Sequence, residues 1–329
     1  MPVSEKPSKT VLVTGGAGFI GSHLSEALLA GGHRIVCLDN FNDYYDPAVK
    51  RRNLQAVRQS ERFTLVEGDI LDLGLLRRVF EAHAVDIVVH LAARAGVRPS
   101  IAQPLLYQQV NVEGTNNLLE LAREAGVEKF IFGSSSSVYG KNEKVPFSED
   151  DSVDHPISPY AATKKAGELI CYTYHHLYGL PVTCLRFFTV YGPRQRPDMA
   201  IHKFTRLLHR GEAIPMFGDG ESRRDYTFIS DIVHGICNAI EFCESYHIYN
   251  LGESRTIALK ELIQLIAEAL GVEAKIQRLP DQPGDVPITY ADISRAQREI
   301  QYQPKVAIET GVKEFVKWYR EVASTQGMS

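Results

Sequence analysis

The sequence predicts an α/β fold in which a doubly wound parallel sheet is accompanied by a smaller C-terminal lobe. Its 329 residues, of which 44% are hydrophobic, are enough to bury a large core. In Thr10–Leu24 a β-branched run meets a cluster of glycines and then a helical pattern, which is typical of the first strand, turn and helix of such a sheet. The continuous apolar run Val85–Leu91 is typical of a strand that is buried on both faces.

Three glycines predict a phosphate-binding turn after the first strand. Gly15 opens the turn, Gly18 lets the backbone approach a pyrophosphate, and Gly21 lets the helix pack closely on the strand. The N-terminus of the helix then faces the phosphates. The strand and the helix that this motif requires are both present, although an ordinary glycine-rich turn has the same form.

An acidic residue ends the next strand. The apolar run Arg34–Leu38 leads to Asp39, whose carboxylate can bind the ribose diol of an adenosine. A 2′-phosphate at this position would meet the same negative charge without an adjacent arginine, so NAD is preferred to NADP. The loop Asn40–Pro47 is expected to cover the adenosine, or to form a surface loop in its outer residues, and a charged helix starts near Ala48.

The next two strands are expected to end beside the same cofactor. Phe63–Glu67 alternates like a strand. Beyond it, Asp69 can accept from the adenine amino group while Ile70 packs on the ring, provided that the sheet is doubly wound. After the apolar run that starts at Val85, Ala92 and Ala93 are small enough for a cofactor to pass close by.

Two arginines follow in the loop Arg94–Ser100, where such sheets form the rim of a ligand crevice. Arg98 is expected either to face the ligand or to lie in solvent. Helical spacing over Asn111–Ala125 predicts a helix that packs on the sheet or on a partner subunit.

Hydroxyl and phenol groups gather in the second half of the predicted sheet. Lys129–Phe132 predicts a strand, and the serines Ser134–Ser137 emerge where α/β sheets place their chemistry. Tyr160 and Lys164 lie one turn apart on a helix that runs to about Tyr178. A lysine ammonium beside a phenol lowers the phenol pKa, which is ordinarily about 10, so Tyr160 can act as a base near neutral pH.

The rest of the chain is predicted to alternate between two lobes. The expected elements are a helix at Asp198–Arg210, a strand and turn at Ile214–Gly220, a helix at Asp231–Phe242, a strand at Tyr246–Leu251 and a helix at Ala258–Leu270. We therefore expect a dinucleotide-binding domain over residues 1–187, to which the chain returns at about 229–255. A second lobe is expected over 188–228 and 256–329.

Composition excludes several classes of function. The formal net charge of −4 shows no basic excess, so neither a nucleic acid nor a membrane is an expected partner. Five scattered cysteines lack paired ligand spacing, which argues against a disulfide framework and against a zinc or other metal site. The N-terminal residues carry prolines and alternating charges in place of an apolar signal core, and a cytoplasmic location is expected.

Six segments carry a resemblance to a known family: Asp39–Asp46, Ala95–Arg98, Ser134–Gly140, Arg186–Pro193, Arg196–Ala200 and Gly284–Pro287. With the glycine turn, they make the sequence resemble the sugar-nucleotide branch of the extended short-chain dehydrogenase/reductase superfamily along essentially its whole length. Within that branch the sequence resembles the UDP-glucuronate 4-epimerases. Arg94 and the pair Arg194-Gln195 depart from the residues usual in these enzymes.

The resemblance implies a catalytic set, a tightly bound NAD and a homodimer. Ser135 is the implied hydroxyl partner of Tyr160 and Lys164, and a hydroxyl there can stabilise charge as it develops on the substrate oxygen. The implied NAD-binding residues are Gly15, Gly18, Phe19, Ile20, Gly21, Asp39, Asn40, Asn42, Asp69, Ile70, Leu91, Ala92, Ala93, Tyr160, Lys164 and Phe187.

The implied substrate is a UDP-sugar. Relatives that dehydrate the sugar carry an acidic pair where this chain has Ser136 and Ser137, so dehydration is disfavoured and decarboxylation is weakened. Arg196 can bind a uronate carboxylate together with Thr189, or it can instead meet a phosphate or Asp198. The implied substrate-binding residues are Arg98, Ser136, Ser137, Thr189, Arg196, Met199, Lys203, Phe217, Arg224 and Asp285.

The expected activity is therefore 4-epimerisation of UDP-glucuronate to UDP-galacturonate through a 4-keto sugar. The alternatives are a 4-epimerase of UDP-glucose or UDP-N-acetylglucosamine, then a UDP-glucuronate decarboxylase. A third alternative, an NAD-binding regulatory protein without activity, is disfavoured by the intact set of Ser135, Tyr160 and Lys164.

Overall fold

Strands and helices alternate along the first half of the chain. The computed structural model describes residues 7–280 and 286–325. The strands are β1 (Thr10–Thr14), β2 (Arg34–Asp39), β3 (Phe63–Glu67), β4 (Ile87–His90), β5 (Lys129–Ser135), β6 (Val182–Phe187), β7 (Thr189–Tyr191), β8 (Ile214–Phe217), β9 (Arg223–Phe228), β10 (Tyr246–Leu251), β11 (Thr256–Ala258) and β12 (Ile276–Leu279). The α-helices are α1 (Phe19–Ala30), α2 (Pro47–Asn53), α3 (Leu73–His83), α4 (Val97–Ala102), α5 (Pro104–Gln108), α6 (Gly114–Glu124), α7 (Pro159–Tyr178), α8 (Ala200–His209), α9 (Ile229–Phe242), α10 (Leu259–Leu270), α11 (Ser294–Ile300) and α12 (Ile308–Thr325). A π-helix, η1 (Gln109–Glu113), and a 3₁₀-helix, η2 (Ser136–Tyr139), complete the set of described helical elements.

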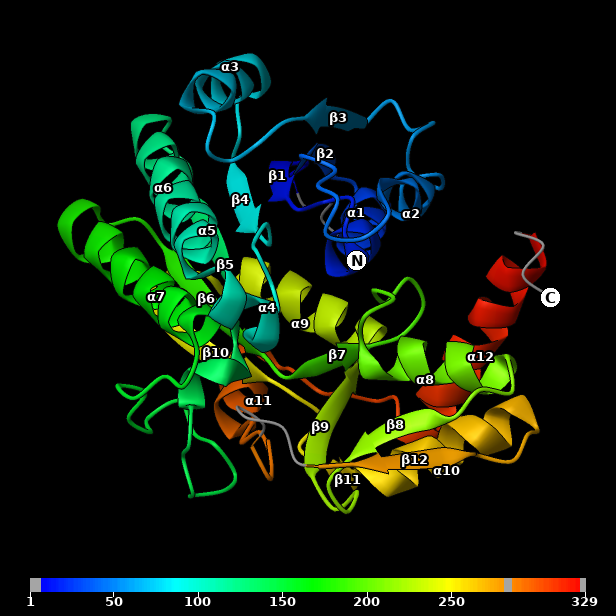
Figure 1. Cartoon of the computed structure of the whole chain (residues 1–329). Helices are drawn as coiled ribbons and strands as arrows, with labels where there is room; N and C mark the ends of the chain where they lie inside the picture. The colour runs from blue at the N-terminus through cyan, green and yellow to red at the C-terminus, as the bar shows by residue number, and fades with distance from the viewer. Residues whose placement is uncertain (1–6, 281–285, 326–329) are drawn as a thin grey trace, which may run out of the picture. The chain divides into compact units, whose positions relative to one another are not determined.

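Within these described residues, seven strands form the main sheet in the order β10-β6-β5-β4-β1-β2-β3 (Figure 1). β1 pairs in parallel with β2 on one side and with β4 on the other, and the pairs β2–β3 and β4–β5 are parallel too. The chain moves outward from β1 to β3 and then crosses back to β4, so the strand order reverses between β1 and β4. Doubly wound sheets bind their ligands at this point. The predicted fold class is confirmed.

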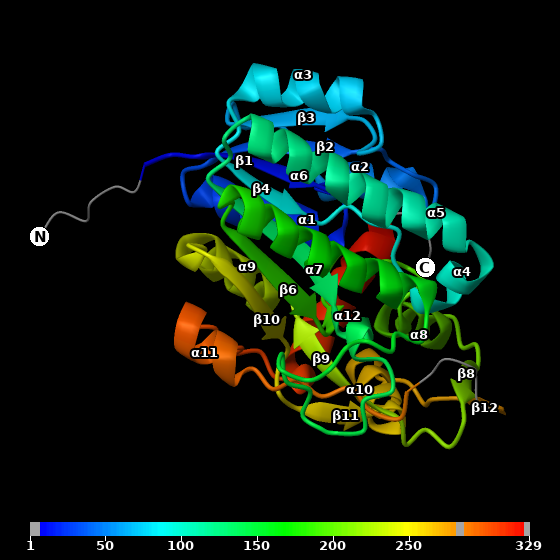
Figure 2. The same cartoon turned by 90° about the vertical axis from the view of Figure 1, so that its left-hand side faces the viewer.

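Helices cover both faces of this sheet. In Figures 1 and 2, α3, α6 and α7 lie on one face, and α1 lies on the other. Leu12 of β1, Val88 of β4, Leu76 of α3 and Leu118 of α6 belong to one buried cluster, and each is fully buried. The apolar stripes of α3 and α6 and the apolar strands therefore close a core on one face of the sheet.

Proline and capping residues determine where two helices near the site begin. Ser158 precedes α7 and its Oγ accepts a hydrogen bond from Ala161 N at 3.1 Å, while Pro159 takes the first helical position. Asp46 and Pro47 act in the same way for α2. Both helices begin one residue earlier than the sequence pattern predicts, because proline is accommodated in the first turn, where its missing N–H is not needed.

The helix predicted over Asn111–Ala125 starts earlier than expected. Helical structure begins at Pro104 in α5, passes through the π-helix η1 and continues as α6. Leu105 is 80% exposed whereas Tyr107 is buried, so the first turn does not show the regular apolar stripe from which the helix was predicted. Similarly, the predicted loop Arg94–Ser100 runs into the short helix α4.

The chain divides into two compact units. Unit 1 comprises Met1–Ser134, Ser158–Leu185 and Ile236–Ile248, and unit 2 comprises Ser135–Ile157, Arg186–Gly235 and Tyr249–Ser329. Unit 1 holds most of the seven-stranded sheet, and unit 2 holds the sheets β11-β9-β7 and β12-β8. The C-terminal elements α8, β8, α9, β10 and α10 lie where the sequence predicts them, with bounds that differ by two residues or fewer, except that β8 ends at Phe217.

The segment Ser135–Ile157 belongs to unit 2, whereas the sequence pattern predicts it within the first domain, residues 1–187. The rings of Tyr139 and Phe147 lie 6.3 Å and 6.4 Å from the ring of Phe188, measured between centroids. Phe147 N also donates a hydrogen bond to Tyr290 O at 2.7 Å. These contacts join the segment to parts of the chain that are far away in the sequence.

In the part of the chain that the structure describes, none of the helices has both the length and the apolar composition that crossing a membrane requires.

Candidate functional site

The glycine turn after β1 is shaped for a close approach. Gly15 has a φ of +67°, and its N–H donates to Leu38 O at 2.8 Å. A Cβ on Gly15 would lie 2.8 Å from Ala92 N, and a Cβ on Gly21 would lie 2.4 Å from Gly15 O, so larger residues do not fit at either position. Gly18 caps α1 without a side chain, and the first turn of α1 has no acidic residue. The N–H groups of a helix end of this kind are suited to bind a pyrophosphate, such as that of NAD.

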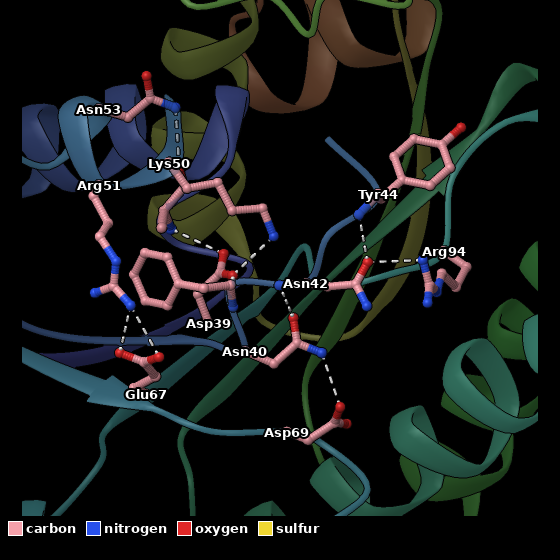
Figure 3. Close-up of polar contacts among 12 residues, drawn as sticks. Asp39, Asn40, Asn42, Tyr44, Lys50, Arg51, Asn53, Glu67, Asp69 and Arg94 are labelled. Atoms are coloured by element: carbon pink, nitrogen blue, oxygen red, sulfur yellow. Dashed lines mark hydrogen bonds and ion pairs between the residues drawn. The ribbon is translucent and has the colours of Figure 1, made fainter. Parts of the chain in front are cut away.

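Asp39 lies at the end of β2 and is 6% exposed. Its Oδ1 accepts hydrogen bonds from Phe41 N at 2.9 Å and from Lys50 Nζ at 3.1 Å, and its Oδ2 accepts from Ala17 N at 3.2 Å. Figure 3 shows the Lys50 ammonium pointing at this carboxylate. Oδ1 thus already accepts two hydrogen bonds, whereas Oδ2 accepts one, so Oδ2 retains the capacity to accept from a ribose hydroxyl.

Lys50 was not singled out from the sequence. A charged residue in a charged helix carries no pattern that marks it as buried, and only the fold brings it 3.1 Å from Asp39. Its charge compensates the buried carboxylate. Next to it, the Arg51 guanidinium lies 4.3 Å from the ring centroid of Phe41, a residue with a φ of +48°, and this stacking supports the strained backbone beside Asp39.

A chain of hydrogen bonds links the residues that are expected to hold the adenosine. Asn40 Nδ2 donates to Asp69 Oδ2 at 2.8 Å, and Asn42 N donates to Asn40 Oδ1 at 3.0 Å. Arg94 NH1 then donates to Asn42 Oδ1 at 2.8 Å (Figure 3). Because β1 and β2 lie between β3 and β4 in the sheet, these hydrogen bonds cross the carboxyl ends of β1 and β2. Arg94, a departure from the family pattern, thus completes a contact between two loops.

Six other expected cofactor contacts lie on this edge of the sheet within unit 1. Phe19 and Ile20 form the first turn of α1, Ile70 follows β3 and is buried, and Leu91, Ala92 and Ala93 follow β4 and are half-buried. Phe187 is the last residue of β6.

Lys164 is held in a buried position on α7, one turn after Tyr160. It is 5% exposed, its Nζ donates to Gly133 O at 2.6 Å, and the ammonium lies 5.0 Å from the ring centroid of Phe132. Burial lowers the pKa of Lys164 from 10.5 to about 8. At neutral pH the side chain therefore remains an ammonium, as the expected role beside a phenolate requires.

Neighbouring residues fix Tyr160, which is half-buried. The ring of Tyr107 meets it edge to face, with 6.2 Å between the centroids, and Tyr107 OH donates to Ala95 O at 2.7 Å. Thr163 Oγ1 donates to Tyr160 O at 2.9 Å. The backbone and the ring of Tyr160 are thus both held within unit 1.

The serines at the end of β5 and the start of η2 have different hydrogen-bond partners. Ser134 Oγ donates to the buried carboxylate of Glu168 at 2.7 Å, which gives this serine a structural role. Ser135 is the last residue of β5, and its Oγ accepts from Ser137 N at 3.2 Å and lies 3.1 Å from Ser137 Oγ. Ser136 and Ser137 are half-buried in η2. Ser135 is therefore the serine at the end of the strand, where the sequence analysis places the catalytic hydroxyl.

Unit 2 carries most of the expected substrate contacts. Thr189 opens β7, Met199 precedes α8, Lys203 lies on α8, Phe217 ends β8 and Arg224 lies on β9, and all five residues are half-buried. Arg98 lies on α4 of unit 1 and is exposed. Asp285 lies outside the described residues.

Arg196 has the protein partner that the sequence analysis named as an alternative. Its Nε and NH2 groups donate to the two carboxylate oxygens of Asp198, each at 3.0 Å. This bidentate pair occupies one edge of the guanidinium. A sugar carboxylate would have to displace Asp198 from that edge or use another edge.

Comparisons with known proteins identify relatives of this chain. The model of the family described as GDP-mannose 4,6 dehydratase matches residues 12–315. UDP-glucuronate 4-epimerase 2 of Arabidopsis thaliana is 47% identical over 329 residues, covering 94% of this chain and 75% of that protein. An uncharacterized protein of Methanocaldococcus jannaschii is 45% identical over 315 residues, covering 95% and 97%. The crystal structure of UDP-glucuronic acid 4-epimerase from Bacillus cereus, in complex with UDP-glucuronic acid and NAD, has a TM-score of 0.89 at 36% identity and covers 95% of this chain and 99% of that chain.

Proposed function

The chain belongs to the NAD-dependent epimerase/dehydratase family of extended short-chain dehydrogenases/reductases, and from this premise we propose that it converts UDP-glucuronate to UDP-galacturonate by inverting carbon 4. As an enzyme of the sugar-nucleotide 4-epimerase type, it uses NAD. The observation that carries the choice of sugar is the likeness to the Bacillus cereus enzyme, whose bound sugar nucleotide is UDP-glucuronic acid and whose structure matches 95% of this chain.

Tyr160 is the proposed base for the 4-hydroxyl group. It takes the hydroxyl proton, and the Lys164 ammonium on the same face of α7 stabilises the phenolate that this role requires. The Gly133 carbonyl keeps that ammonium in place, and Lys164 is also proposed to anchor the nicotinamide ribose. Ser135 is proposed to donate to the substrate oxygen as its charge develops. The chemistry that bound NAD would supply is the acceptance of the hydride from carbon 4 and its later return to the same carbon.

The uronate carboxylate is proposed to bind Arg196. A guanidinium holds a carboxylate bidentately, whereas the hydroxymethyl group of a neutral sugar offers it no charge. Since Asp198 occupies the same edge of the guanidinium, the sugar carboxylate is proposed to displace it. Thr189, Ser136 and Ser137 are the proposed further donors. Binding the carboxylate as an anion also opposes loss of carbon dioxide from the 4-keto sugar, which is a β-keto acid.

The nucleotide half of the substrate is proposed to be held more firmly than the sugar. Inversion requires that the 4-keto sugar turn over while the UDP moiety stays bound. The proposed contacts to the remainder of the substrate are Arg98, Met199, Lys203, Phe217, Arg224 and Asp285.

A homodimer in the cytoplasm is proposed as the working form. On α7, Leu169, Tyr172 and Leu177 are 56%, 49% and 65% exposed, and Leu105 of α5 is 80% exposed. Large apolar side chains on neighbouring helices of one unit are typical of a surface that a second copy covers. The five cysteines are all free thiols, which suits a reducing compartment.

The substrate is tested by incubating the purified enzyme and NAD with UDP-glucuronate, UDP-glucose or UDP-N-acetylglucosamine in parallel. Proton NMR of the anomeric signals identifies each product. The proposal predicts that UDP-glucuronate is converted to UDP-galacturonate fastest, without net NADH and without carbon dioxide. Faster epimerisation of a neutral UDP-sugar would overturn the assignment of Arg196 but would not affect the assignment of Tyr160 as the base. Release of carbon dioxide would identify a decarboxylase.

A further inference from the structure

His90 is a buried histidine that the proposed chemistry does not use. It ends β4, is 1% exposed, and packs against the rings of Phe130 and Phe132. Its Nδ1 lies 2.8 Å from Thr14 Oγ1, and its Nε2 lies 3.0 Å from Thr115 Oγ1. The imidazole therefore joins the end of β1 to helix α6.

The hydrogen bonds of Thr14 and Thr115 determine which ring nitrogen of His90 carries the proton. The Thr115 hydroxyl donates to Asn111 O at 2.6 Å, so toward His90 it accepts. The Thr14 hydroxyl accepts from Ala92 N at 3.2 Å and has its own proton to donate to His90 Nδ1. All four hydrogen bonds form together only when the imidazole is neutral and carries its proton on Nε2.

The surroundings keep this ring neutral. Burial lowers the pKa of His90 from 6.5 to about 3, and the nearby Lys164 ammonium acts in the same direction. Both ring nitrogens are engaged by threonine hydroxyls, and the ring is buried. His90 is therefore unsuited to take up or release a proton during the reaction, and its contribution has to come from geometry.

The hydrogen bonds of this cluster reach two sides of the cofactor site. Ala92 lies against the glycine turn, where a Cβ on Gly15 would lie 2.8 Å from Ala92 N. Asn111 Oδ1 accepts from Arg94 N at 2.8 Å, and Asn111 Nδ2 donates to Arg94 O and to Thr163 Oγ1, each at 3.0 Å. Thr163 directly precedes Lys164 in α7. The backbone after β4 is thus tied to the glycine turn and to the catalytic helix.

We propose that His90 is a positioning residue, whose neutral Nε2–H imidazole holds the Leu91–Arg94 backbone in register with the glycine turn and with α7. This backbone is then ordered before NAD arrives, so that binding does not have to order it. The inference rests on the family's use of NAD and not on the identity of the sugar.

The test compares the affinities of full-length, NAD-free variants for NAD by titration calorimetry. Glutamine carries an acceptor and a donor side by side, as the ring does, whereas leucine carries neither. His90→Leu is expected to weaken NAD binding about tenfold or more, and His90→Gln about threefold or less, because leucine removes one hydrogen-bond partner from each of the buried hydroxyls of Thr14 and Thr115. Thr115→Val removes only a hydroxyl and is expected to weaken binding about fivefold.

Thr183→Val is the matched control for the threonine variant. Thr183 is 1% exposed, and its hydroxyl lies beside the Cys243 thiol, a weak hydrogen-bonding group, so its loss should leave NAD affinity unchanged. If His90→Leu does not fold, Thr115→Val carries the test alone. Equal NAD affinities for wild type and Thr115→Val, or equal losses in His90→Leu and His90→Gln, would overturn the proposal.

A spectroscopic readout tests the tautomer directly. In protein with ¹⁵N-labelled histidine, the signals that vanish in His90→Gln should report a protonated Nε2 and a bare Nδ1 from about pH 5 to about pH 9. A doubly protonated ring or the opposite tautomer would contradict the assignment. Neither measurement uses a sugar nucleotide, so a wrong substrate in the proposed function would leave both results standing.

Discussion

Replacing Lys164 with methionine is expected to abolish turnover and yet to stabilise the NAD-free protein. Burial lowers the pKa of Lys164 from 10.5 to about 8. A pKa shift of this size means that, at neutral pH, the charged Lys164 side chain is about 3 kcal/mol less favourable in the folded chain than in the unfolded chain. Methionine is similar in length and uncharged, and loss of the hydrogen bond to Gly133 O costs about 1 kcal/mol. The free energy of unfolding at about pH 7 should therefore rise by about 2 kcal/mol.

Urea unfolding over a range of pH measures this effect and its sign. As the pH rises from about 8 toward 10.5, the folded wild type releases the Lys164 proton while the unfolded chain keeps it, so the wild type gains stability. The advantage of the methionine variant should narrow over this interval. A variant that is less stable than wild type at about pH 7, or a difference that does not change with pH, would refute the reasoning. Lys141→Met, which changes an exposed lysine, should alter stability by about 0.5 kcal/mol or less.

Three further predictions concern the proposed base, the acid proposed to bind the ribose, and the proposed sugar. Tyr160→Phe should lower turnover about 10²-fold to 10⁴-fold while leaving NAD bound, and full turnover in this variant would exclude Tyr160 as the base. Asp39→Asn should weaken NAD binding about tenfold and destabilise the protein by about 2 kcal/mol in urea unfolding, because it leaves the buried Lys50 ammonium unpaired. Adding Lys50→Met should restore stability but not affinity; a loss of stability that persists in the double variant would argue against the charge pair. Arg196→Ala should raise the KM for UDP-glucuronate about tenfold and Asp198→Ala should lower it, with the KM for UDP-glucose nearly unchanged, whereas equal effects on both sugars would move Arg196 to the phosphates.

The elements around the expected cofactor site could be predicted well because local patterns determine them. The glycine turn, the acid at the end of β2 and the strand β3 lie where the sequence places them, since each depends on residues that are adjacent in the chain. The prediction that this helix begins at Asn111 was wrong, because helical structure begins at Pro104. An exposed apolar residue such as Leu105 and a π-helix both interrupt the periodicity on which the prediction depends.

The partners of the site residues could not be predicted, because they come from distant parts of the chain. Thr14 and His90 are 76 positions apart, and no pattern in either segment indicates that they form a hydrogen bond. The same is true of Arg94, which reaches Asn42 across 52 positions. Sequence motifs therefore identified groups that are expected to contact the ligands, while the structure supplied the groups that hold them in place.

The central claim is that one hydride leaves carbon 4 of UDP-glucuronate and returns to the same carbon. Incubating the enzyme and NAD with UDP-glucuronate that carries deuterium at carbon 4, and following the product by proton and deuterium NMR, tests this directly. We predict UDP-galacturonate that retains the deuterium at carbon 4. Product in which the deuterium has exchanged with water, or has moved to another carbon, would contradict the account.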